Sequence, residues 1–268
     1  MTSAPAAGRR WAPRPLIANP TLRWAVRLVV LAYLAAVVMT IDVNWGRVAQ
    51  GIERSGRLLG DFLQPDFASR WSDIRIGILE SLTMTAVATV VGVLLAIPVS
   101  VGAARNLAPL PVYLVSRAYI ALSRTFPEVI VAIVFVVMMG FGPFAGLLTL
   151  TFASVGFIAK LLAEDIEDID EAQLEAMRAT GASWWQVVAY AVVPQVMPRF
   201  VGLSVYRLDI NFRESTILGI VGAGGIGATL TTAMSRYDFD SAGAILIIVI
   251  AIVLALEYLS GAVRKAVQ

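Results

Sequence analysis

An otherwise apolar segment at about residues 194–221 carries four charged residues in addition to Arg199 near its start. They are Arg207, Asp209, Arg213 and Glu214. An ionisable side chain at membrane depth is costly, and it usually faces the interior of a helix bundle or a water-filled cavity. Spacings of four and seven residues place Asp209 near Arg213 and Glu214 near Arg207, so these charges can neutralise one another. Alternatively the arginines bind an anion, because the planar guanidinium fork matches the oxygens of a phosphate group.

The two arginines differ in depth and in local neutralisation. If Arg199 marks one membrane surface, Arg207 lies roughly 12 Å and Arg213 roughly 21 Å further along the helix. Their side chains point about 120° apart around the helix axis, so they do not both face one pore. Arg213 has a carboxylate one turn away, whereas that of Arg207 is two turns away. We therefore expect Arg207 to be the anion contact, in a path formed by Arg207, Arg213, Asp209, Asn211, Glu214 and Ser215.

Arg124 and Glu128 form a second candidate pair outside this segment. They are four residues apart, which is one helical turn. We expect them to pair with each other as structural charges.

The residue types that the chain lacks exclude several kinds of chemistry. It contains no cysteine and no histidine, so thiol nucleophiles and the commonest metal ligand and general base are excluded. We expect no metal site and no cofactor bound by this chain. These absences count against a membrane-embedded lipid enzyme, which remains one alternative. An ion-driven secondary transporter is another, although the chain lacks the internal repeat that such transporters often have.

The composition predicts an all-α polytopic membrane protein. Hydrophobic residues make up 58% of the 268 residues and charged residues 15%, against about 25% charged residues in soluble domains. The net charge of +2 predicts no nucleic-acid partner. A spanning helix needs about 20 predominantly apolar residues. Six segments qualify, at about 24–41, 78–102, 118–139, 144–163, 194–221 and 241–260.

An acidic loop and a conspicuous motif follow the fourth segment. Residues 164–175 read EDIEDIDEAQLE. We expect a helix over 171–179, a stop at Gly181 where glycine takes positive φ, and a restart at Ser183 with Gln186 in the capping-box position. Pro194 then stands at the entry to the next span. Two short helices joined by a glycine bend form a compact knob that is suited to docking into a soluble partner.

The knob resembles the EAA loop of type I ABC importer permeases, whose pattern is E-A-A-x3-G-x9-I-x-L-P. The matching residues are Glu175, Ala176, Met177, Gly181, Ala191, Val193 and Pro194. Residues 206–227, YRLDINFRESTILGIVGAGGIG, further resemble the phosphonate permease subgroup, the PhnE-type family. The resemblance implies a permease subunit with a MetI-like core, which carries phosphonate or, alternatively, phosphite or phosphate. It also implies that Glu175, Ala176, Gly181, Ser183 and Pro194 couple the chain to an ATPase.

The same resemblance implies the partners. These are a second copy in a homodimer, two ABC ATPase subunits that bind ATP, an extracytoplasmic binding protein and the lipid bilayer. The chain itself has no G-x-x-x-x-G-K-[ST] loop, so we expect it not to hydrolyse ATP. The glycines Gly222, Gly224, Gly225 and Gly227 fit a dinucleotide fingerprint, but they follow a membrane segment and not a strand. We expect them to form a close-packing turn.

The domain organisation follows from these elements. Most Lys and Arg residues fall on one side if both termini are cytosolic, in a multi-pass protein of the bacterial cell membrane. No A-x-A-like site follows Ile41, so we expect an uncleaved first helix. The expected parts are a tail (1–23), a first helix (24–41), an external loop with an amphipathic helix (42–75), a permease core (76–262) with a coupling loop (164–193), and a C-terminus (263–268).

Overall fold

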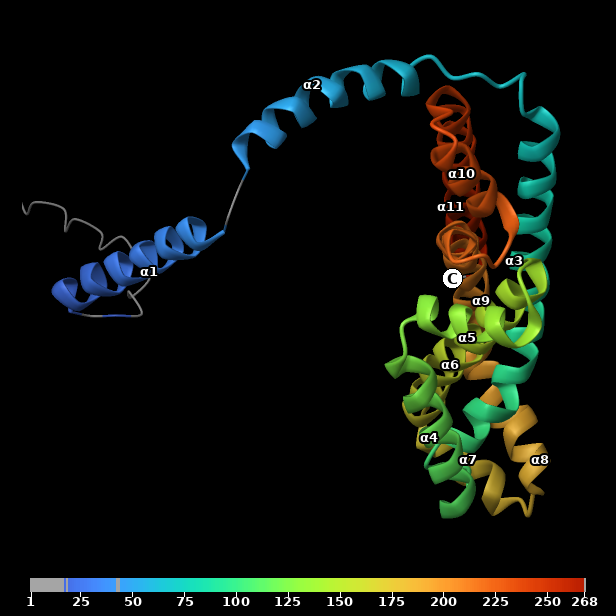
Figure 1. The fold of residues 1–268 in the computed structure, drawn as a ribbon. Coiled ribbons are helices and arrows are strands. Elements are labelled where there is room, and N and C mark those ends of the chain that lie inside the picture. The colour runs from blue at the N-terminus through green and yellow to red at the C-terminus, as the bar shows by residue number, and fades with distance from the viewer. Residues whose placement is uncertain (1–16, 18, 42–43, 268) are drawn as a thin grey trace, which may run out of the picture. The chain divides into compact units, whose positions relative to one another are not determined.

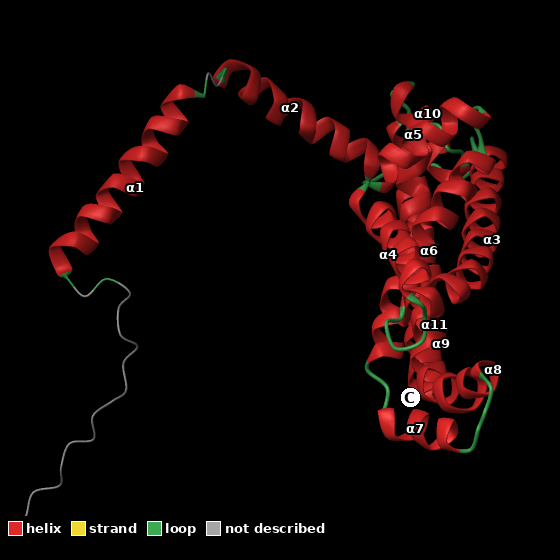
Figure 2. Cartoon of the chain, turned by 90° about the horizontal axis from the view of Figure 1, so that it is seen from below, coloured by secondary structure: helices red, strands yellow, loops and turns green. Residues whose placement is uncertain are grey.

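The computed structural model describes residues 17, 19–41 and 44–267, and every regular element in these ranges is a helix (Figure 2). The fold class expected from the composition is therefore confirmed. The chain divides into two compact units, Met1–Gly56 and Arg57–Gln268. Of the expected domain parts, most of the tail (1–23) and Gln268 lie outside the described residues.

The first unit contains α1, Pro20–Thr40, and most of α2, Trp45–Phe62. Asn19 caps α1, because its side chain accepts a hydrogen bond from the backbone N–H of Thr21 at 3.1 Å, and Pro20 takes the first helical position. The 21 residues of α1 are predominantly apolar, and none is buried. A helix of this length spans about 30 Å, which matches the hydrocarbon core of a bilayer.

In the second unit three long helices pack side by side. They are α3 (Trp71–Ala103), α6 (Pro143–Glu167) and α9 (Val193–Ile220). Small residues permit the close approach: a Cβ on Gly92 of α3 would lie 2.5 Å from the side chain of Ser154 on α6. Helix α11, Phe239–Val267, packs along α9. In the described residues five helices are long and apolar enough to cross a membrane.

The third expected span is not one continuous helix. The sequence predicted it at about 118–139, whereas α4 covers Leu110–Thr125 and α5 covers Glu128–Met139, with a bend of 96° between them. Pro127 is the cause, because proline disfavours helical backbone in the residue before it, and Phe126 is extended. Counting this bent pair as one span brings the number to six.

The turn between α5 and α6 contacts the turn between α9 and α10, Gly225–Ser235. The backbone N–H of Gly142 donates to the carbonyl of Gly222 at 3.0 Å. Gly224 has φ +75°, and a Cβ there would lie 2.6 Å from the backbone nitrogen of Pro143. Glu80 on α3 accepts a hydrogen bond from the backbone N–H of Gly225 at 3.0 Å and so caps α10. Gly222 and Gly224 thus lie in a close-packed turn, whereas Gly225 and Gly227 belong to the first turn of α10, where Gly227 packs closely against α9.

The second unit has two distinct ends. The short helices α7 (Glu171–Ala179) and α8 (Trp184–Val187) lie at one end, and α10 lies at the other (Figure 1). A π-helical turn, Val188–Val192, joins α8 to α9.

Candidate functional site

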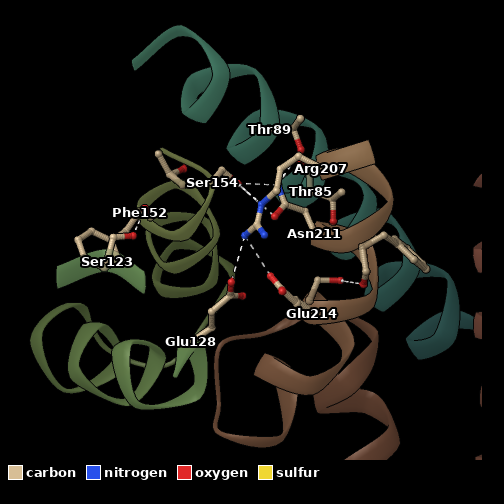
Figure 3. A network of polar contacts seen from close by, with 12 residues as sticks. Thr85, Thr89, Ser123, Glu128, Phe152, Ser154, Arg207, Asn211 and Glu214 are labelled. Atoms are coloured by element: carbon tan, nitrogen blue, oxygen red, sulfur yellow. Dashed lines mark hydrogen bonds and ion pairs between the residues drawn. The ribbon is translucent and has the colours of Figure 1, made fainter. Parts of the chain in front are cut away.

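Arg207 of α9 occupies the centre of a buried polar network (Figure 3). Only 2% of the residue is exposed. Its Nε donates to the Ser154 hydroxyl at 2.9 Å, and its Nη2 lies 3.2 Å from a carboxylate oxygen of Glu128 and 3.2 Å from one of Glu214. Helices α5, α6 and α9 therefore meet at one guanidinium group.

The neutral polar residues near Arg207 are also occupied within the chain. The Asn211 amide donates to the Thr89 hydroxyl at 2.8 Å and to the Ser154 hydroxyl at 2.9 Å. The Ser215 hydroxyl donates to the carbonyl of Phe212 at 2.7 Å. Asn211 and Ser215 are fully buried. Asn211 therefore joins α3, α6 and α9, and the donors of both side chains already have acceptors inside the bundle.

The expected Arg124–Glu128 pair is replaced by a pairing over a longer sequence distance. Glu128 pairs with Arg207, while the guanidinium carbon of Arg124 lies 5.4 Å from the centre of the Phe157 ring. Arg207 packs against the same ring at 5.3 Å. The bend at Pro127 ends α4 before Glu128, so Arg124 and Glu128 are not on one continuous helix face. Sequence analysis assigned Glu128 to the wrong partner and did not identify Ser154 or Phe157 at all.

Arg213 lies in a different environment. Its side chain is 49% exposed on the surface of the chain, and it pairs with Asp209, whose side chain is 5% exposed. This neutralisation within one turn of helix was expected from the sequence. Arg213 lies seven residues beyond Tyr206, which lies seven beyond Arg199, so all three occupy one face of α9. Both Tyr206 and Arg199 are exposed.

The knob after α6 has the local structure that the sequence predicted. Helix α7 spans Glu171–Ala179, and Gly181 has φ +75°. The Ser183 backbone N–H donates to the side chain of Gln186 at 2.8 Å, which completes the capping box. Glu175, Ala176, Gly181, Ser183 and Pro194 are all exposed.

The loop between α3 and α4 holds this knob in place. The Trp184 ring N–H donates to the Leu107 carbonyl at 3.2 Å, and Arg178 donates to the Asn106 carbonyl at 3.4 Å. Glu167, at the end of α6, accepts from the backbone N–H of Arg105 at 2.8 Å. Nη2 of Arg117 donates to both carboxylate oxygens of Glu167, each at 2.8 Å. Leu174 and Val187 bury the inner face of the knob against this loop.

Comparison with known proteins places these features in a family. The family model described as "Binding-protein-dependent transport system inner membrane component" matches residues 88–268, which is more than half of the chain. The match includes the knob, the Arg207 network and the glycine-rich turn.

Individual relatives and solved structures agree with this match. The chain is 45% identical over 202 residues to the phosphate-import permease protein PhnE of Mycolicibacterium smegmatis, covering 75% of this chain but only 38% of that protein. It is 41% identical over 216 residues to the phosphite transport system permease protein PtxC of Stutzerimonas stutzeri, covering 80% and 78%. Its fold is similar to a chain of the inward-facing MetNI methionine ABC transporter, with a TM-score of 0.63, 24% identity and coverage of 72% and 94%.

Proposed function

The chain belongs to the family of binding-protein-dependent transport system inner membrane components, and we propose that it forms the translocation path of an ATP-driven importer for phosphorus oxyanions. It is a transport subunit and not an enzyme, because ATP hydrolysis in such systems is carried out by a partner ATPase. The substrate class is phosphonate or a closely related ion, phosphite or phosphate. The relatives named for phosphate and phosphite import support this class.

The half-exposed Arg213 is the observation that carries the proposal. Along α9 it lies roughly 21 Å beyond Arg199, which is membrane depth. An arginine facing lipid there is costly, so its exposed face requires water or a second subunit. We therefore propose that the face of α9 with Arg213 lines the path and that Arg213, not Arg207, contacts the anion. Arg207 has two carboxylate partners within the chain and little exposure.

The remaining path residues divide in the same way. Asp209 balances Arg213 while no anion is bound. Asn211 and Glu214 belong to the network around Arg207, whereas Ser215 donates to the Phe212 carbonyl on its own helix.

The proposed assembly is a dimer of this chain with two ATPase subunits and one extracytoplasmic binding protein. A symmetric dimer places two copies of Arg213 around one axis, which is the simplest closed arrangement. The alternative is a heterodimer with a related permease chain. Purification of the complex distinguishes the two, because a heterodimer contains a second permease chain. We propose that the end with α7 and α8 is cytosolic, together with both termini, because most Lys and Arg residues then lie inside.

Reconstitution tests the proposed function. Proteoliposomes that contain the permease, the ATPase and the binding protein are expected to take up radiolabelled methylphosphonate, phosphite or phosphate only with ATP. The permease alone is expected to hydrolyse no ATP. Uptake that is driven by an ion gradient without the ATPase would instead indicate a secondary transporter.

Coupling to the ATPase depends on the bend at Gly181. We expect Gly181→Pro to abolish uptake and to weaken ATPase binding at least tenfold. Proline fixes φ near −65°, whereas Gly181 has φ +75°, and it removes the N–H that donates to the Arg178 carbonyl at 3.0 Å. Co-purification of the ATPase and uptake measure the effect. Gly181→Asn is the control, because asparagine tolerates positive φ and is expected to retain both activities.

A further inference from the structure

A cavity of about 300 Å³ opens between α9 and the end of α11, away from the Arg207 network. Its lining consists of Pro198, Arg199, Gly202, Leu203, Tyr206 and Arg264. The volume far exceeds the roughly 30 Å³ that one water occupies. The lining includes two arginines and no acidic residue, so the cavity is suited to an anion.

The two guanidinium groups are held in place by contacts that leave donors free. Arg199 pairs through Nε with Asp165 at 2.9 Å, and its side chain is 67% exposed. Arg264 donates through Nε to the Ser260 carbonyl at 3.4 Å, and its guanidinium carbon lies 5.7 Å from the centre of the Tyr206 ring. Within the described residues, the terminal nitrogens of both arginines have no acceptor. Among the described residues, each arginine therefore has N–H groups that no protein acceptor occupies.

Arg264 packs against one face of α9. Arg199, Gly202 and Tyr206 lie on one helix face, at spacings of three and four residues. A Cβ on Gly202 would lie 3.8 Å from Cγ of Arg264, an ordinary van der Waals distance, so the arginine stem packs over this position of α9. Tyr206 then packs against the guanidinium from the next turn.

We propose that this cavity binds a phosphate-type oxyanion between Arg199 and Arg264. Guanidinium groups bind such oxygens through paired, charge-assisted hydrogen bonds. The cavity lies on the same face of α9 as Arg213 and nearer to the α7–α8 end, so a bound anion joins α9 to α11 at that end. Two sources share this chemistry: a free phosphorus oxyanion and the headgroup of an anionic phospholipid.

Binding of radiolabelled inorganic phosphate to the purified permease–ATPase complex tests the free-anion source. We expect Arg264→Gln to weaken binding by tenfold or more, since a hydrogen bond to a charged group is worth about that factor. Lys265→Gln, on the exposed neighbouring residue, is the matched control and is expected to bind as the wild type does. The measurement is repeated with Asp209→Asn/Arg213→Gln, which removes the proposed path contact and leaves this cavity intact. If Arg264→Gln still weakens phosphate binding in this double variant, the phosphate binds in the cavity. That result does not depend on the proposed path.

The lipid source is tested in nanodiscs of phosphatidylcholine with or without phosphatidylglycerol. Retention of phosphatidylglycerol in native mass spectra is expected to fall with Arg264→Gln and to persist with Lys265→Gln. Loss of either phosphate binding or lipid retention supports the site and identifies its source. If neither ligand distinguishes Arg264→Gln from the wild type, the proposal is overturned.

A conservative variant protects the test against misfolding. If Arg264→Gln does not assemble, Arg264→Lys keeps the charge but loses the planar fork. It is expected to bind the ligand several-fold more weakly than the wild type, and unchanged binding would overturn recognition through the planar fork, on which the proposal rests.

Discussion

Arg207→Gln is expected to prevent stable assembly of the permease, and not only to slow transport. The substitution leaves Glu128 and Glu214 facing each other without the guanidinium that lies 3.2 Å from both. Removing one partner of a fully buried ion pair costs about 3–5 kcal/mol. The side chains of Glu128 and Glu214 are 26% and 25% exposed, so we expect a loss near the lower end of that range. The yield of monodisperse complex in detergent and its thermal midpoint measure the loss.

Two further variants test whether the unpaired carboxylates cause the loss of stability in Arg207→Gln. Arg124→Gln is the matched control, because Arg124 contacts the same Phe157 ring but is exposed, and it is expected to leave the thermal midpoint nearly unchanged. Glu128→Gln and Glu214→Gln added to Arg207→Gln are expected to restore part of the stability by removing the uncompensated charges. If Arg207→Gln assembles with normal stability and lacks only uptake, Arg207 is the anion contact after all.

The double variant Asp209→Asn/Arg213→Gln is expected to assemble normally and to lose at least tenfold in uptake. Arg213→Gln alone would leave the buried carboxylate of Asp209 without its partner. Replacing both residues avoids this cost. The loss follows because the path no longer offers a cation to the anion. Initial uptake rates in proteoliposomes measure it, alongside the thermal midpoint of the complex.

Asp209→Asn alone is the control for this pair. It keeps Arg213 and frees its guanidinium, so uptake is expected to persist. If Arg213 serves only to neutralise Asp209, the double variant transports as the wild type does, and the assignment of Arg213 to the path fails.

Local signals in the sequence predicted the knob well. Glycine at 181 and the Ser183–Gln186 cap act within a few residues, so the backbone conformation follows from neighbouring side chains. The pairing of Asp209 with Arg213 is local in the same sense, because one helix positions both. The class of fold followed from the composition and from the lengths of the apolar segments.

The Arg207 network could not be predicted in the same way. Glu128 is 79 residues from Arg207 in the sequence, and it reaches the guanidinium only because the chain bends by 96° near Pro127. The sequence contains the proline but not the direction of the bend. Ser154 is likewise fixed by the close packing of α3 on α6 at Gly92, which no spacing within α6 indicates.

The attachment of the knob to the α3–α4 loop has a mechanical consequence. Carbonyl groups of Asn106 and Leu107 accept hydrogen bonds from the knob, so a displacement of the knob pulls directly on the end of α3. Helix α3 has 33 residues, which corresponds to a lever of about 50 Å. A tilt of about 5° at the loop would swing the far end of such a rigid rod by about 4 Å. Pro98 lies inside α3 near its end at Ala103 and removes one backbone hydrogen bond of the helix. Motion of the knob therefore reaches the far end of α3 through this proline, and any bend there reduces the swing of the far end.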